Sequence, residues 1–195
     1  MNETKELILK NTIELISKKG DATIREIAEK AKVNVASINY HFGNKNNLLK
    51  EVESYFSETL YRVQNNVLEN PNLDAEEKII QWALELMEFM FKYPSIVSLI
   101  SKLVNEENAY SPAILDKVYM NSEIIEKLSM LIAIVTNISD EKIIQFKYLQ
   151  IFSGILGPVL NELLFTIYRK ENSLSMRNEN IREEYIRYLV RTNLK

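Results

Sequence analysis

The side chains best suited to hydrogen-bonding chemistry gather between Asn34 and Lys45. Asn39 carries an amide that can pair with the edge of an adenine through two hydrogen bonds. Tyr40 and His41 carry donors of the kind that contact phosphate oxygens, and Lys45 adds a positive charge. Contacts of these two kinds fix a protein on a duplex and read its sequence. This segment therefore points to nucleic acid as a partner.

The rest of the sequence offers little for catalysis. The chain has no cysteine, and therefore no thiol nucleophile, disulfide framework or thiolate zinc site. It has no Gly-rich phosphate loop, and its single histidine lies within the segment just described. No cluster of metal ligands stands at a diagnostic spacing. We therefore expect no enzyme, no cofactor and no metal.

Two short helices joined by a tight turn are predicted to position these side chains. The first spans 23–32, where Thr23 can act as the cap and Glu26, three places later, completes a capping box. The second spans 34–42 and begins with Asn34 as its cap. One face of each helix is apolar at helical spacing, with Ile24, Ile27, Ala28 and Ala31 in the first and Ile38 and Phe42 in the second. Because the turn between the helices has room only for Lys32 and Val33, the helices must cross at a steep angle, which is the helix-turn-helix geometry.

The second helix keeps small and polar side chains for its outer face. Val35, Ala36 and Ser37 are small enough for the helix to approach the floor of a DNA groove, and the first two can touch a thymine methyl. Asn44 is predicted to cap a longer helix, whose free N–H groups would form an anion site together with Lys45. An ordinary helical hairpin with an uncharged surface shows the same periodicity. Spacing alone leaves both interpretations open.

The run from Thr23 to Leu49, TIREIAEKAKVNVASINYHFGNKNNLL, resembles the DNA-binding signature of TetR-family transcriptional regulators. The residues at the positions that this family's pattern expects are Thr23, Ile27, Ala28, Ala31, Val33, Ser37, Ile38, Tyr40, His41, Phe42, Lys45 and Leu48. The departures are Lys32, where the family usually has Gly, and Asn34, which replaces the usual Ser. Lys32 must adopt a left-handed backbone or use a different turn. The resemblance covers about the first quarter of the chain.

The DNA contact is assigned to residues of the two short helices and the start of the third. They are Thr23, Arg25, Asn34, Val35, Ala36, Ser37, Asn39, Tyr40, His41 and Lys45. We expect Tyr40, His41 and Lys45 to contact phosphates, and Asn39 to read a base.

Composition favours an all-α protein. In 195 residues, 46% of them apolar, there are only four Gly and four Pro. Residues 1–50 hold nine Lys/Arg and six Asp/Glu, a balance of +3, and the remaining 145 hold 15 and 21, a balance of −6. A basic head on an acidic body would orient the chain toward a polyanion.

We expect about nine helices in two domains. A helix-turn-helix DNA-binding domain is predicted over 1–50, and a helical ligand-binding and dimerisation domain over 51–195. Besides the two short helices, the predicted helices are 3–19, 44 to about 69, 74–92, 96–107, 112 to about 137, 140 to about 170, and 181–194. Ser139 is the expected cap of the helix at 140. The first helix should pack behind the two short ones through Leu7 and Ile8.

The apolar stretch 151–168 is long enough for a membrane span. We reject that interpretation because Asn161 and Glu162 would lie in the middle of the bilayer. Gly154, Gly157 and Pro158 instead predict a kink and a close approach by another helix. The first residues are acidic and lack the apolar core of a signal peptide, so a cytoplasmic protein without membrane contact is expected.

The last two helices have apolar faces with no later partner in the chain, so they either pack on their own core or pair across a two-fold axis. A dimer can place two recognition helices on adjacent turns of one duplex. The resemblance also implies a homodimer through these two helices.

The centre of the chain is a candidate ligand site. Met and aromatic residues that can line an apolar cavity, or that can be ordinary core, are Trp82, Leu86, Phe89, Met90, Met120, Met130 and Phe152. Glu85, Glu88 and Asn161 are candidate polar anchors. The resemblance implies an unidentified small-molecule inducer.

The expected function is therefore a ligand-responsive regulator, in the family's usual mode a repressor. It would bind a palindromic operator in double-stranded DNA as a dimer, and a small, largely apolar ligand would release it. The alternative is a helix-turn-helix protein that acts through protein partners, or on DNA without a ligand.

Overall fold

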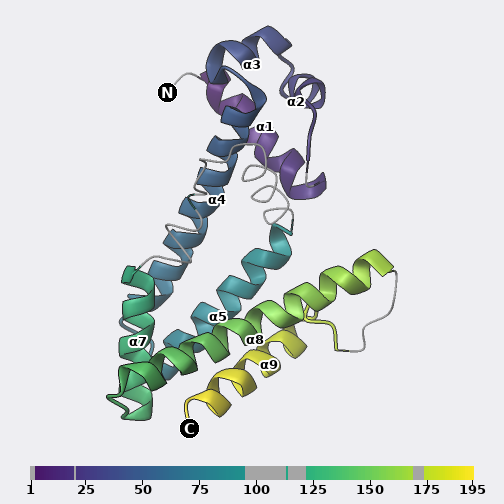
Figure 1. Ribbon diagram of the computed structural model, residues 1–195. Coiled ribbons are helices and arrows are strands. Elements are labelled where there is room, and N and C mark those ends of the chain that lie inside the picture. Colours follow the sequence, from purple (N-terminus) through teal and green to yellow (C-terminus); the bar gives the residue numbers. More distant parts are fainter. Residues whose placement is uncertain (1–2, 20, 95–112, 114–121, 169–173) are drawn as a thin grey trace. The chain divides into compact units, whose positions relative to one another are not determined.

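The computed structural model describes residues 3–19, 21–94, 113, 122–168 and 174–195. Every regular element in these ranges is an α-helix, as expected for an all-α protein (Figure 1). The helices are α1 (Glu3–Lys19), α2 (Ile24–Ala31), α3 (Val35–Phe42), α4 (Lys45–Leu68), α5 (Ala75–Lys92), α7 (Ser122–Thr136), α8 (Glu141–Tyr168) and α9 (Glu179–Asn193). The predicted helix 96–107, the predicted helix start at 112 and the predicted helix end near 170 lie outside the described residues.

Contacts divide the chain into two compact units. The first comprises Met1–Thr59 and Lys92–Met120, and the second comprises Leu60–Phe91 and Asn121–Lys195. Helix α4 contributes residues to both units, because it runs from Lys45 to Leu68. The boundary between residues 50 and 51 is a functional division and stays a proposal.

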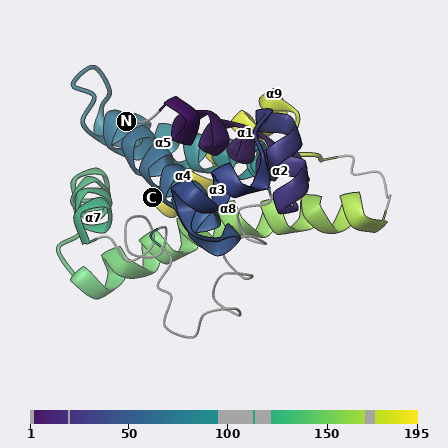
Figure 2. The same ribbon diagram turned by 90° about the horizontal axis from the view of Figure 1, so that it is seen from above.

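In the first unit, α1, α2 and α3 pack against one another (Figures 1 and 2). Their shared core contains fully buried isoleucines from all three helices, Ile8, Ile16, Ile27 and Ile38. Burial of each such side chain stabilises the fold by about 1.5–3 kcal/mol. The expectation for Leu7 was wrong, because Leu7 is 46% exposed while Ile8 is fully buried. Adjacent residues of a helix point about 100° apart, so of these two residues only Ile8 faces the shared core.

In the second unit, α8 and α9 lie side by side (Figure 1). A Cβ on Gly154 of α8 would lie 2.5 Å from a methyl carbon of Leu189 on α9, so the predicted close approach is confirmed at this glycine. The hydroxyl of Tyr185 donates to the carbonyl oxygen of Gly154 at 2.7 Å. A Cβ on Gly157 would meet no atom within 4 Å, so no described part of this chain approaches that glycine closely. Gly157 sits on the outer side of α8.

Arginines of α9 hold that helix to α5. Arg187 donates to both carboxylate oxygens of Glu77, at 2.9 and 3.0 Å. Arg191 donates to Glu76 at 3.0 Å. The hydrogen bonds from Arg187 hold the pKa of the Glu77 carboxyl below its ordinary value. The two-pronged contact fixes α9 in orientation as well as in position.

Two helix starts differ from the predictions because of their caps. The side chain of Asp140 accepts the N–H of Lys142 at 2.9 Å, so Asp140 and not Ser139 caps α8. Asn178 accepts from Asn180 and Ile181, and therefore α9 begins at Glu179, two residues before the predicted start. In both places a side-chain oxygen satisfies N–H groups that the first helical turn leaves without partners.

Candidate nucleic-acid interface

The start of α2 is fixed by the predicted capping box. The Thr23 hydroxyl accepts the N–H of Glu26 at 3.2 Å, and the Glu26 carboxylate accepts the N–H of Thr23 at 2.7 Å. Both contacts satisfy backbone donors that would otherwise lack partners. Thr23 and Arg25 are exposed at this end of α2.

The backbone of Lys32, in the turn between α2 and α3, is left-handed, which was one of the two conformations that the sequence left open. Lys32 adopts the left-handed conformation, with φ 54° and ψ 40°. Its N–H donates to Glu29 at 3.1 Å, and the N–H of Val33 donates to Ala28 at 3.0 Å. This hydrogen-bond pattern is the one that glycine usually closes at a helix end. The turn therefore has the geometry of a glycine turn, although a lysine occupies it at a steric cost.

Helix α3 turns its small and polar side chains outward. Its cap is confirmed, because the Asn34 side chain accepts the N–H of Ser37 at 2.7 Å. Ile38 and Phe42 are buried, at 0% and 5% exposure, and anchor the helix on the core. Among the predicted contact residues, Asn34, Ala36, Asn39 and Tyr40 are exposed, and Val35, Ser37 and His41 are half-buried.

The exposed row Ala36, Asn39 and Tyr40 is a continuous strip along one side of α3, since residues three and four apart share a helix face. Tyr40 is 84% exposed, which is unusual for a large aromatic residue without a partner to cover it. Its ring meets that of His41 edge to face, at 5.1 Å between centroids. The strip exposes the amide of Asn39 and the phenol of Tyr40, two groups that can form hydrogen bonds in the major groove of DNA.

Lys45 is engaged in an ion pair that the sequence did not indicate. Its Nζ lies 3.1 Å from Oδ1 of Asp21, and the same oxygen accepts the N–H of Ala22 at 2.8 Å. The predicted cap of α4 is confirmed, because Asn44 accepts the N–H of Asn47 at 2.9 Å. Asp21 and Lys45 are 24 residues apart, and no local pattern pairs them. Any anion that bound the Lys45 ammonium would have to compete with this carboxylate.

The residues proposed for a ligand site lie in the second unit. Trp82, Leu86 and Phe89 are buried, and Met90 and Phe152 are half-buried. Met120 lies outside the described residues. Met130 of α7 is 58% exposed, and it lines a separate hollow of about 360 Å³ together with Ile144 and Gln145 of α8.

Sequence reasoning missed two neighbours of Trp82. The indole N–H donates to Oε1 of Gln64 at 3.0 Å. The ring of Tyr148 lies 6.4 Å from the Trp82 ring, and Phe152 stacks on Tyr148 at 5.9 Å. Gln64 is polar, so the apolar pattern did not mark it as a residue of the interior. It is also 18 residues from Trp82, so no local pattern predicted their contact.

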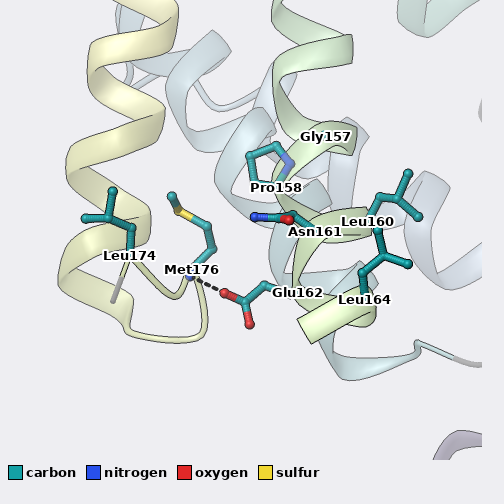
Figure 3. Close-up of a pocket in the computed structure, with 8 residues that line it drawn as sticks. All are labelled: Gly157, Pro158, Leu160, Asn161, Glu162, Leu164, Leu174 and Met176. Atoms are coloured by element: carbon teal, nitrogen blue, oxygen red, sulfur yellow. Dashed lines mark hydrogen bonds between the residues drawn. The ribbon is translucent and has the colours of Figure 1, made fainter. Parts of the chain in front are cut away.

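The outer face of α8 is a strip of exposed apolar residues. Phe146, Leu149, Leu160 and Leu164 are 48%, 52%, 59% and 44% exposed, and their spacing places them on one side of the helix. A groove of about 540 Å³ lies at the far end of this strip (Figure 3), lined by Gly157, Pro158, Leu160, Asn161, Glu162, Leu164, Leu174 and Met176.

One window of α8, from Glu141 to Glu162, is long and apolar enough by composition to cross a membrane, and 22% of it is buried. The Glu162 side chain at its end is 4% exposed and accepts the N–H of Met176 at 3.0 Å (Figure 3). Arg177 lies 3.8 Å from the same carboxylate. This acid is therefore partnered within the chain, as buried acids in proteins usually are.

Comparison with known proteins identifies the N-terminal segment. Residues 8–52 match the family model for bacterial regulatory proteins of the tetR family. The probable HTH-type transcriptional regulator YttP of Bacillus subtilis (strain 168) is 24% identical over 128 residues, 64% of this chain and 62% of YttP. The match therefore spans less than two thirds of that relative's length.

Solved structures agree over nearly the whole chain. A TetR transcriptional regulator from Legionella pneumophila has a TM-score of 0.65 at 22% identity and covers 98% of each chain. The multidrug binding protein EbrR, in complex with imidazole, has a TM-score of 0.51 at 20% identity, covering 99% of this chain and 96% of EbrR. These structural likenesses establish the fold.

The segment matched by the family model contains α2, the left-handed turn and α3, with both caps and the exposed strip in place. The proteins that the chain resembles are regulators and not enzymes. Residues 8–52 therefore carry the segment that defines the tetR family of bacterial regulatory proteins, and the chain has the fold of solved TetR regulators.

Proposed function

We propose that two copies of this chain form a repressor that binds a palindromic operator and leaves it when a small, largely apolar molecule binds. The observation that carries the proposal is the exposed strip of α3, formed by Ala36, Asn39 and Tyr40. A helix fits the major groove of B-DNA, and an asparagine amide there pairs with adenine. A cytoplasmic site of action without membrane contact goes with this role.

Two substitutions test the contact with DNA. Asn39→Ala should change which base is preferred at one position of each half-site, because the amide reads a base edge. Lys45→Ala should weaken binding to all sequences alike and flatten the salt dependence by about one unit of slope, because one phosphate contact is lost. Anisotropy titrations over a salt series measure both effects. If neither variant changes affinity or slope, the alternative of a protein partner takes the place of DNA.

The exposed strip of α8 supports a dimer through α8 and α9. Removing these apolar side chains from water is favourable in free energy. A two-fold axis would let the strip pair with the same strip of a second copy. Gly157 and Ser153 lie within the strip and allow a close approach of a second helix. Leu160→Glu combined with Leu164→Glu should give a monomer by analytical ultracentrifugation. The same changes should also weaken operator binding, since the two heads would no longer be linked.

A ligand would act by preferring a conformation in which the two heads no longer fit one duplex. Helix α4 has residues in both compact units, so a ligand that alters its position in the second unit also alters the recognition unit. By linkage, operator DNA must weaken ligand affinity by the same factor, typically about 1–3 kcal/mol. Ligand titrations with and without operator that give the same affinity would contradict this coupling. Such a result would favour a DNA-binding protein that needs no ligand.

A further inference from the structure

The side chain of Gln64 has a hydrogen-bonding group without a partner in the part of the chain that the structure describes. Gln64 is 1% exposed, and its Oε1 accepts the indole N–H of Trp82 at 3.0 Å. An indole N–H can only donate, so the amide oxygen must face Trp82. The amide nitrogen is then left for another partner, and among the described residues no acceptor lies within hydrogen-bond distance of it.

Buried polar atoms without partners are uncommon in folded proteins, because such an atom has lost its water and gained nothing in return. A single trapped water is a poor remedy, since a buried water needs two to four polar partners. Among the described residues, Gln64 Nε2 is the one buried side-chain nitrogen or oxygen without a partner. A bound molecule that carries an acceptor would satisfy it.

The indole that donates to Gln64 begins a row of aromatic rings. Trp82 of α5 is 2% exposed, and the ring of Tyr148 of α8 lies 6.4 Å from it. Phe152 continues the row, nearly parallel to Tyr148 at an interplanar angle of 21°. Flat rings in such a row make favourable stacked or edge contacts with another aromatic ring. Donor and rings all belong to the second unit, on α4, α5 and α8.

We propose that Gln64 is the polar anchor of the ligand site and that the site takes an uncharged aromatic compound with a carbonyl oxygen, which accepts from Gln64 Nε2. The proposal rests on the proposed ligand response and names its ligand class. A carboxylate would need a cation or several donors to offset its burial. A cationic amine would offer Nε2 only another donor. A neutral carbonyl oxygen can be satisfied by the one N–H donor that Gln64 supplies, and its burial leaves no charge to be offset.

The test uses probes of one shape and different chemistry: acetophenone, ethylbenzene and benzoate. The chain contains one tryptophan, so its indole N–H gives a single signal in a nitrogen-15 spectrum of the full-length protein. Because that indole donates to Gln64, the signal reports directly on this site. We expect acetophenone to bind about tenfold more tightly than ethylbenzene, the usual worth of one buried hydrogen bond. Benzoate should bind more weakly than acetophenone.

Gln64→Met keeps the length of the side chain and removes the donor, so the preference for acetophenone over ethylbenzene should vanish. The measured quantity is the ratio of the affinities for acetophenone and ethylbenzene in the same variant. A general loosening of the site weakens both affinities and leaves this ratio unchanged. Gln81→Leu is the matched control, since the Gln81 amide already donates to Glu77 at 2.8 Å and should not affect the ratio. The wild-type ratio tests the proposal even if the Gln64 variant does not fold.

Equal binding of acetophenone and ethylbenzene, strongest binding of benzoate, or no binding of any probe would overturn the proposal. So would a preference that survives in Gln64→Met. The proposed function is tested separately by adding acetophenone to the complex with operator DNA. If the probe binds with the expected preference but leaves DNA affinity unchanged, the site stands and the ligand response fails. If no probe binds while specific DNA binding persists, the anchor fails and the DNA-binding role stands.

Discussion

Replacing Lys32 by glycine should stabilise the protein, which is unusual for a change that removes a side chain. Lys32 has φ 54° and ψ 40°, where a Cβ approaches the backbone too closely. That conformation costs an ordinary residue about 1–2 kcal/mol, and glycine avoids this cost. Glycine also makes the unfolded chain more flexible, which takes back about 0.4–1 kcal/mol. The expected net gain is about 0.5–1 kcal/mol, or a melting temperature higher by about 1–3 °C.

Lys32→Ala is the control that separates strain from charge. It removes the same charge but keeps a Cβ, so the strain remains and stability should stay near that of the wild type. Lys32→Asn should fall between them, because asparagine tolerates the left-handed region better than most residues. Urea unfolding at one fixed protein concentration measures the series. If the glycine variant is no more stable than the alanine variant, the turn does not hold Lys32 in a strained conformation.

Three further substitutions test contacts of the two units. Arg187 lowers the pKa of Glu77 from about 4.5, so this pair stabilises the fold above that pH and loses its effect as the pH falls through the lowered value. Glu77→Gln should therefore be less stable than wild type at pH 7, and the gap should close in acid; thermal melts that show a constant gap would refute this. Tyr185→Phe removes a 2.7 Å hydrogen bond to a carbonyl of α8 and should cost about 1 kcal/mol in urea unfolding, whereas an unchanged midpoint would mean that the bond adds nothing. Asp21→Asn frees Lys45 for phosphate and should tighten DNA binding about twofold to fivefold at low salt, and weaker binding would show that Asp21 does not compete with DNA.

Helix positions followed from the sequence wherever the caps and the apolar spacing agreed. Thr23, Asn34 and Asn44 each precede an amphipathic run, and each caps the predicted helix. At α8, two cap-forming residues stand next to each other, Ser139 and Asp140. Local pattern does not rank them, and the structure selects Asp140.

The outer face of the candidate DNA site also followed from the sequence, because burial of Ile38 and Phe42 fixes which side of α3 faces out. Contacts between residues of different elements could not be predicted from the sequence. Asp21 meets Lys45, and Gln64 meets Trp82, only because helices bring distant residues together. Met130 has the same apolar character as a core residue, yet it is exposed, and composition cannot separate the two cases.

Selecting bound sequences from random duplex DNA tests the central claim most directly. A symmetric pair of α3 helices should enrich an inverted repeat whose half-sites are centred about one helical turn apart, or about 34–36 Å. Asn39→Ala should select the same spacing with a relaxed base at one position of each half. Enrichment of a single, asymmetric site, or of no sequence at all, would contradict the account.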